Sequence, residues 1–287
     1  MTEERKAPLL VPLDGSLDAS QPLEVAQAVA YLRGDDIAVL LVSAEPLGEE
    51  QVAEALSVPK EWLPRVTLLN TVGEPAEGIC RVARDIEADV ILMSSHGRTG
   101  DMRSLAGHVT LQVLQDPPCP VLVVRSALNL KAQARRLRHL RRVCVPLDGS
   151  AEAIWSVRVG SALAQQANAR LFMLHVINDR PEVGAASSLL TYSDQSSYQL
   201  EVWQEEFVRS SFAVASRSQE VMTSVALRFG EPDREIIGFA TEADCDLIVA
   251  AWSGRISEGR AKVVHMLLEQ SPCPLLFVRA REPRPSA

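Results

Sequence analysis

The hexapeptide Val-Pro-Leu-Asp-Gly-Ser occupies residues 11–16 and recurs unchanged at residues 145–150. Each copy follows an apolar run that is typical of a buried strand, and its Asp-Gly-Ser end favours a sharp turn. An unchanged repeat of this kind divides the 287-residue chain into two similar units. Each unit holds about 140 residues, which is an ordinary size for a domain with its own core.

Further motifs recur in the same order in both halves. Residues 72–75 (VGEP) correspond to 229–232 (FGEP), 87–92 (EADVIL) to 244–249 (DCDLIV), and 118–125 (PCPVLVVR) to 272–279 (PCPLLFVR). We therefore expect a first domain over residues 1–126, a basic linker over 127–142 and a second domain over 143–281.

Composition excludes several classes of protein. The net charge of −8 argues against a general nucleic-acid binder. No apolar run approaches the ~18 residues that a membrane-spanning helix needs, and the charged, polar start does not resemble a secretion signal. The five cysteines form no CxxC pair. These features predict a cytoplasmic protein with reduced, mostly buried thiols.

The expected linker is strongly basic. Residues 126–142 carry six basic side chains and no acidic one, namely Lys131, Arg135, Arg136, Arg138, Arg141 and Arg142. Its apolar residues, Leu130, Ala134, Leu137 and Leu140, could line one side of a short helix. A solvated connector is the simpler interpretation, and a helix that binds an anion or a partner is the alternative. The absence of aromatic anchors favours the connector.

Apolar runs alternate with helical patterns throughout both units, which predicts an α/β fold with an open parallel sheet. In the first unit we expect strands at 9–13, 37–42, 66–71, 90–94 and 121–124, with helices at 22–32, 49–56, 75–86 and about 104–115. In the second unit we expect strands at 143–147, 171–176, 222–228, 247–251 and 275–278, with helices at 153–166, about 200–217 and 232–241.

Sheets of this kind bind ligands at the carboxyl ends of their strands, where the strand order reverses. The turn after the first strand and the loop after the fourth strand of each unit are therefore the first places to look for a site. His175, near the end of a strand, has no second ligand at metal spacing and is expected to pack or cap. Asp244 and Asp246 have the sequence context of solvated turn residues.

Together these motifs resemble the universal stress protein family. The resemblance rests on VPLDGS, VGEP, the run ADVILMSSHGRTG and the ending PCPVLVV, and it covers nearly the whole chain as two domains in tandem. It implies two Rossmann-like domains, each with a five-stranded parallel sheet flanked by helices. Some members of the family bind ATP and others do not. If this chain binds a ligand as those members do, the resemblance implies an adenine nucleotide, and Mg²⁺ as an accompanying ion is left open.

The resemblance also places the nucleotide-binding residues of the first unit. ATP-binding members carry a Gly-x2-Gly-x9-Gly-Ser/Thr loop, and that register falls here on Ser94, Gly97, Gly107 and His108. Two glycines are kept, while Ser replaces the first glycine and His replaces the hydroxyl residue. The implied site consists of Pro12, Asp14, Ser94, Gly97, Arg98, Gly107, His108 and Val109. The alternative is that this stretch is only a helix-entry loop and that Asp14 only caps its turn.

The second unit departs further from the ATP-binding pattern. Asp148 and Gly254 remain, but Ala251 takes the place of Ser94, and Trp252 adds bulk where a ligand would be crowded. We interpret Trp252 as a packed core or interface residue, because Trp supplies a large buried area. The sequence therefore predicts a nucleotide site in the first unit and a degenerate, structural second unit.

The last strand of each unit is expected to lie at a sheet edge, where an apolar strand invites pairing. Strand 121–124 is therefore predicted to lie beside strand 275–278 as an intramolecular pseudo-twofold pair, and further association into a homodimer is left open. Three functions follow: a nucleotide-binding stress sensor or regulator with an unidentified protein partner, a nucleotide-independent interaction module, and a slow ATPase. The ATPase ranks last because neither a base nor a Walker lysine is visible.

Overall fold

All ten apolar runs predicted as strands form strands in the computed structural model. The structure describes residues 7–15, 20–34, 36–95, 108–125, 128–148, 150, 153–177, 221–252 and 258–279. The strands of the first unit are β1 (Leu9–Leu13), β2 (Ile37–Ser43), β3 (Val66–Val72), β4 (Val90–Ser94) and β5 (Val121–Val124). Those of the second unit are β6 (Arg142–Leu147), β7 (Arg170–Ile177), β8 (Thr223–Phe229), β9 (Leu247–Trp252) and β10 (Leu275–Arg279).

The strands join into one sheet with the order β3-β2-β1-β4-β5-β10-β9-β6-β7-β8. Every pairing within a unit is parallel, and the pairing of β5 with β10 is antiparallel. The second unit repeats the strand order of the first in reverse, with β6 to β10 in the places of β1 to β5, as a pseudo-twofold pair requires. The predicted pairing of residues 121–124 with 275–278 is therefore confirmed, and Leu276 lies opposite Leu122 in that ladder.

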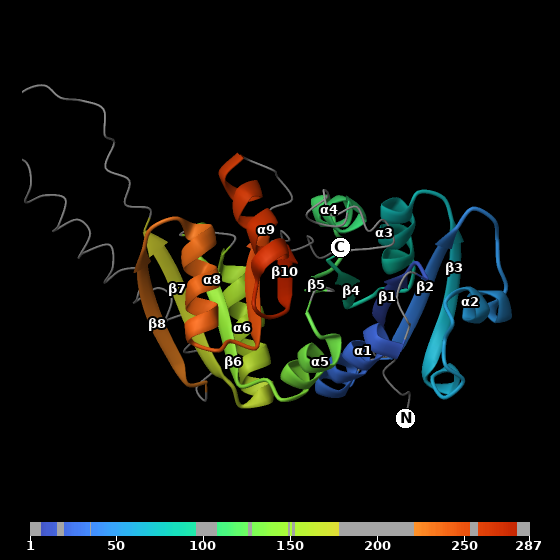
Figure 1. Ribbon diagram of the computed structural model, residues 1–287, viewed down its shortest axis with the longest axis horizontal. Helices are drawn as coiled ribbons and strands as arrows, with labels where there is room; N and C mark the ends of the chain where they lie inside the picture. The colour runs from blue at the N-terminus through green and yellow to red at the C-terminus, as the bar shows by residue number, and fades with distance from the viewer. Residues whose placement is uncertain are drawn as a thin grey trace, which may run out of the picture.

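Helices cover both faces of this sheet (Figure 1). The helices are α1 (Ser20–Arg33), α2 (Glu49–Ala55), α3 (Pro75–Asp85), α4 (His108–Gln115), α5 (Leu130–Arg138), α6 (Ala153–Ala167), α8 (Pro232–Glu242) and α9 (Glu258–Gln270), with a 3-10 turn, η1, at Leu63–Arg65. One core cluster packs α1, α5 and α6 against the sheet, and the other packs α3, α4, α8 and α9 against the opposite face. The α/β prediction with helix-flanked parallel strands is confirmed.

The basic segment contains a helix, α5, that is more than a solvated connector. Asn129 begins it as an N-cap, with its side-chain oxygen accepting a hydrogen bond from the backbone N–H of Ala132 at 3.1 Å. Its apolar side, predicted from the spacing, is buried and packs against α1 of the first unit through Leu130, Ala134 and Leu137, and Leu140, just after the helix, is buried in the same core. The connector expectation was wrong on this point, because these four residues bury apolar area between the units.

The α8–β9 turn contacts α5 and the residues that follow it through two carboxylates; Asp244 is exposed, as expected of a solvated turn residue, whereas the expectation was wrong for the buried Asp246. Asp246 is 8% exposed and accepts hydrogen bonds from the backbone N–H groups of Arg141 and Arg142, at 2.9 and 3.1 Å. Asp244 pairs with Arg136 at 2.9 Å and with Arg142 at 2.8 Å. Hydrogen bonding to Arg136, the largest cause, lowers the pKa of the exposed Asp244 carboxyl.

Two other differences from the predicted elements concern helices. The sequence analysis did not predict α9. The predicted helix near 200–217 lies outside the described residues, as do residues 104–107 at the start of the predicted helix near 104–115. Among the described residues, no helix is both long enough and apolar enough to cross a bilayer.

Gly160 of α6 shows how closely that helix approaches the sheet. A Cβ at this position would lie 2.6 Å from Cγ2 of Val145, a fully buried, β-branched side chain of β6 that cannot swing away. Gly160→Ala is therefore expected to lower the free energy of unfolding by about 1–3 kcal/mol, although alanine is the better helix former.

Gly238 of α8 is the matched control, because a Cβ there would meet nothing within 4 Å. Gly238→Ala is expected to raise the free energy of unfolding by about 0.5–1 kcal/mol through helix propensity alone. Urea unfolding followed by circular dichroism measures both variants. Equal effects of the same sign would contradict the close contact between α6 and β6.

Candidate functional site

Each unit has one point where the strand order reverses, and there the two central strands separate. In the first unit the chain runs from β1 outward to β3 and then returns to β4 on the other side of β1. The β1–β4 pairing holds only Leu9 opposite Val90 and Leu10 opposite Ile91, while β1 continues to Leu13 and β4 to Ser94. The pairing therefore ends before the carboxyl ends of β1 and β4, and sheets of this kind usually bind ligands at this position, which we call the first crevice.

The described candidate residues of the first unit come from three elements around this crevice. Pro12 is half-buried on β1, and Asp14 is exposed directly after that strand. Ser94 ends β4 and is half-buried, while α4 begins with the exposed His108 and the half-buried Val109. Three further candidates, Gly97, Arg98 and Gly107, lie outside the described residues.

A hydrogen bond ties the start of α4 to the end of β4. The Thr110 hydroxyl donates to the backbone carbonyl of Ser94 at 2.9 Å. Thr110 is buried, so this bond holds the first turn of α4 beside the crevice. The amino end of a helix carries unsatisfied N–H groups and a partial positive charge, which suits an anionic ligand. Sequence reasoning did not single out the hydroxyl of Thr110.

The turn after β1 requires a glycine at position 15. Gly15 has φ +73°, and a Cβ there would lie 2.9 Å from the backbone oxygen of Ala55 at the end of α2. The Asp-Gly step therefore holds the exposed Asp14 at the carboxyl end of β1 by packing the turn against α2.

The second unit has the same separation of its central strands. Pairing of β6 with β9 holds only Val143 opposite Leu247 and Cys144 opposite Ile248, while the strands continue to Leu147 and Trp252. A cavity of about 520 Å³ lies here, lined by residues of β6, β7, β9, α8 and α9. The sequence analysis did not predict it, since the bulk of Trp252 suggested a filled crevice.

Trp252 instead links the two units. Its side chain is 5% exposed, and the indole N–H donates to the backbone carbonyl of Leu114 in α4 of the first unit. The interpretation of Trp252 as a packed interface residue is therefore confirmed. Since its polar atom is directed to α4, the residue borders the cavity without filling it.

A group of charges closes one side of this cavity. Lys262 of α9 lies 3.0 Å from the carboxylate of Glu231 and 3.3 Å from that of Asp233 at the start of α8. The hydrogen bond to Glu231, and then that to Asp233, raises the pKa of Lys262. Asp233 is 2% exposed, so its carboxylate is a buried charge beside the cavity. In the repeat, Lys262 corresponds to His108 and Asp233 to Ala76.

His175 packs as the sequence predicted. It is buried, and its Nδ1 lies 2.8 Å from the backbone oxygen of Leu147. Within the described ranges, no three His, Cys, Asp or Glu side chains lie together in a way that could hold a metal ion. The five cysteines are buried and form no disulfide, as predicted.

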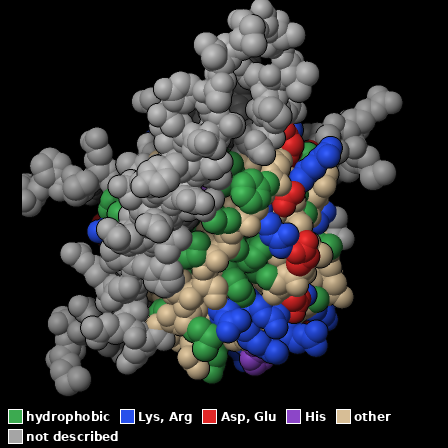
Figure 2. Space-filling model, turned by 90° about the vertical axis from the view of Figure 1, so that its left-hand side faces the viewer, with side chains coloured by type: hydrophobic (Ala, Val, Ile, Leu, Met, Phe, Trp, Pro, Cys, Tyr) green, Lys and Arg blue, Asp and Glu red, His purple; other side chains and the backbone are tan. Residues whose placement is uncertain are grey.

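Basic residues cluster near the end of α5. Figure 2 shows a cluster of Lys and Arg side chains at the lower edge of the molecule in that view. Arg135, Arg138 and Arg141 are exposed. A hollow of about 480 Å³ is lined by Gln27, Tyr31, Arg138 and His139. Tyr31 of α1 is 76% exposed and gives this surface the aromatic residue that the linker itself lacks. The anion- or partner-binding alternative for the basic helix stays a prediction.

Comparison with known proteins identifies relatives of both units. The model of the universal stress protein family matches residues 44–125 and 139–279. A universal stress protein of Methanocaldococcus jannaschii is 35% identical over 78 residues, which are 27% of this chain and 46% of that protein. A protein of Staphylococcus haemolyticus with the same family name is 27% identical over 146 residues, which are 50% of this chain and 86% of that protein.

Solved structures share the tandem arrangement. A universal stress protein from Archaeoglobus fulgidus matches with a TM-score of 0.64 at 18% identity, covering 96% of this chain and 99% of that one. A protein of unknown function from Pseudomonas aeruginosa matches with a TM-score of 0.67 at 15% identity, covering 96% and 92%. At these identities the structures show the fold alone. With the family model matching both units over more than half of the residues, the chain belongs to the universal stress protein family.

Proposed function

We propose that this protein is a cytoplasmic stress sensor or regulator that binds an adenine nucleotide in the crevice of its first unit. The observation that carries the proposal is the arrangement around the separated ends of β1 and β4. Asp14 directly follows β1, and the start of α4 is tied to the end of the neighbouring strand β4 through Thr110 and Ser94. A carboxylate and a helix amino end suit the two ends of a nucleotide, its base or ribose and its phosphates.

Each candidate residue has a distinct role in this proposal. Asp14 accepts a hydrogen bond from the adenine amino group or from a ribose hydroxyl, beside Pro12. The backbone amides at Val109 and Thr110 receive the phosphates, which Mg²⁺ would accompany. His108, exposed at the first position of α4, supplies a ring N–H where the family pattern has a hydroxyl. Gly97, Arg98 and Gly107 keep the roles that the family resemblance implies.

Isothermal titration calorimetry with ATP and Mg²⁺ tests the proposal, and the repeat provides a matched pair of variants. Asp14→Ala removes the carboxylate from the first crevice, and Asp148→Ala removes its counterpart from the second. Both residues are exposed turn residues, and Asp148 accepts a hydrogen bond from the backbone N–H of Ser150 at 3.0 Å, so circular dichroism is used to check that each variant keeps the fold. Asp14→Ala is expected to weaken ATP binding about tenfold or more, and Asp148→Ala to leave it unchanged.

Three outcomes would count against this assignment. Loss of binding in Asp148→Ala alone would move the site to the second unit, and two equivalent sites per chain would refute the asymmetry. Unchanged affinity in Asp14→Ala would remove Asp14 from the site. If the unmodified protein takes up no adenine nucleotide, the competing function becomes the better one, a nucleotide-independent interaction module. The replacement of the family's Gly and hydroxyl by Ser94 and His108 is the observation that favours that alternative.

A further inference from the structure

The cavity of the second unit has the size and shape of a ligand site. Its volume of about 520 Å³ lies within the usual range for small-molecule sites, ~300–1,000 Å³. It lies where β6 and β9 separate, so its position follows from the topology rather than from loose packing. The sheet supplies one wall, and α8 and α9 supply the other.

The body of the cavity is apolar. Leu174 and Val176 of β7, Ile236 of α8, and Val264 and Leu267 of α9 contribute aliphatic side chains. Trp252 adds an indole whose N–H already donates to Leu114 and is not available to a ligand. A molecule held here would gain its affinity mainly by removing apolar surface from water.

The charged end of the cavity is unsuited to phosphate. Its described lining includes the carboxylates of Asp148, Glu231 and Asp233 but only one cation, Lys262. That ammonium group already lies within 3.3 Å of two of the carboxylates. A phosphate at this end would meet an excess of negative charge, part of it on the buried Asp233, and would be repelled.

The first unit lacks this arrangement. The residue that corresponds to Asp233 is Ala76, and the residue that corresponds to Lys262 is His108. The ion pairs between α8 and α9 therefore belong to the second copy, at the helix end where the first copy is proposed to receive phosphates. The two crevices share a position in the fold and differ in the charge that they present.

We propose that the second unit binds a small, predominantly apolar molecule that carries no negative charge. This is a second binding site, separate from the proposed nucleotide site, and it selects against phosphate through Glu231 and Asp233. The second unit is then a receptor for a different class of ligand rather than a structural remnant.

Two fluorescent probes with almost the same ring system test the proposal on the full-length protein. N-phenyl-1-naphthylamine is uncharged, and 8-anilinonaphthalene-1-sulfonate adds one sulfonate. The uncharged probe is expected to bind saturably at one site and about tenfold or more tightly than the sulfonate. Equal binding of the two probes, or no saturable binding of the uncharged probe, would overturn the proposal.

Matched substitutions locate the probe. Val176→Phe adds bulk to the second cavity, and Val42→Phe adds it at the corresponding half-buried position of the first unit. Only Val176→Phe is expected to abolish binding of the uncharged probe, with circular dichroism showing that both variants fold. Equal probe affinity in the two variants would show that the probe lies elsewhere.

A further variant tests the role of charge. The double substitution Glu231→Gln with Asp233→Asn removes both carboxylates that face Lys262, and it is expected to raise the affinity for the sulfonate probe about tenfold. Unchanged sulfonate affinity would refute selection by these residues.

ATP should not displace the uncharged probe, and Asp14→Ala should not change the affinity for that probe. The proposals for the two sites can therefore be refuted independently. Displacement of the probe by ATP would overturn the proposal.

Discussion

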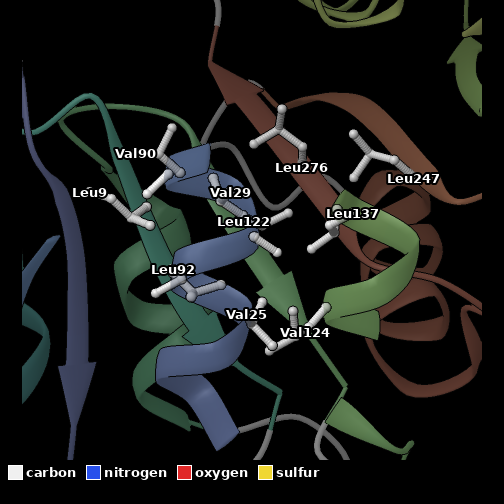
Figure 3. Close-up of a cluster of buried hydrophobic side chains, with 14 of the residues drawn as sticks. Leu9, Val25, Val29, Val90, Leu92, Leu122, Val124, Leu137, Leu247 and Leu276 are labelled. Atoms are coloured by element: carbon white, nitrogen blue, oxygen red, sulfur yellow. The ribbon is translucent and has the colours of Figure 1, made fainter. Parts of the chain in front are cut away.

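Leu122→Asp is expected to lower the free energy of unfolding by at least about 4 kcal/mol, because it places an unpaired carboxylate in a dry core. Leu122 is 4% exposed and lies in β5 opposite Leu276 of β10. Figure 3 shows its side chain directed toward Leu137 of α5, with Val25 and Val29 of α1 nearby. The carboxylate would therefore meet apolar groups from both units and from the helix that joins them.

Urea unfolding followed by circular dichroism measures this loss. Leu63→Asp provides the control, since Leu63 is 40% exposed in the 3-10 turn and its replacement should cost less than about 1 kcal/mol. If Leu122→Asp does not fold, Leu122→Ala answers the same question with an expected loss of about 2–5 kcal/mol. Similar losses for Leu122→Ala and Leu63→Ala would show that the junction of the two units is loosely packed.

Trp252→Ala is expected to destabilise the protein by about 3–5 kcal/mol, since it removes the largest side chain from a buried position. The substitution also leaves the carbonyl of Leu114 without the indole donor that it has across the unit boundary. The effect should therefore exceed that of a similar substitution outside the boundary between the units.

Two further substitutions separate these contributions. Trp252→Phe keeps an aromatic ring but removes the donor and part of the buried volume, with an expected cost of about 1–3 kcal/mol. Trp155→Ala, in α6, serves as the control because Trp155 is half-buried and stacks on Arg158 at 5.2 Å. Denaturant midpoints of the three variants give the comparison. A loss in Trp252→Ala no greater than in Trp155→Ala would contradict its role between the units.

Most of the fold could be predicted from the sequence because two strong signals coincide. Continuous apolar runs predict strands covered on both faces, and the repeated motifs place those strands in the same order twice. The pairing of β5 with β10 could also be predicted, because each unit ends in an apolar edge strand, and the structure adds that this pairing is antiparallel. The burial of α5 was harder to predict, because the six Lys and Arg residues of segment 126–142 favoured a solvated connector over a helix with a narrow, buried apolar side.

The site was less predictable from the sequence for a physical reason. A sequence motif predicts which residues follow a strand, but it does not predict whether side chains fill the space between two separated strands such as β6 and β9. Trp252 is large enough to fill that space, and only the direction of its indole N–H, toward Leu114, shows that it does not. The ion pairs of Lys262 with Glu231 and Asp233 join residues about thirty positions apart, and no local pattern indicates such a contact.

The antiparallel junction of β5 and β10 has a consequence for how such a protein can evolve. When two identical chains associate through a twofold axis, every substitution appears in both partners at once. A covalently joined pair is free of this constraint, so one half can carry an acidic residue, Asp233, where the other carries Ala76. Gene fusion thereby allows the two halves of one molecule to specialise without exchanging partners.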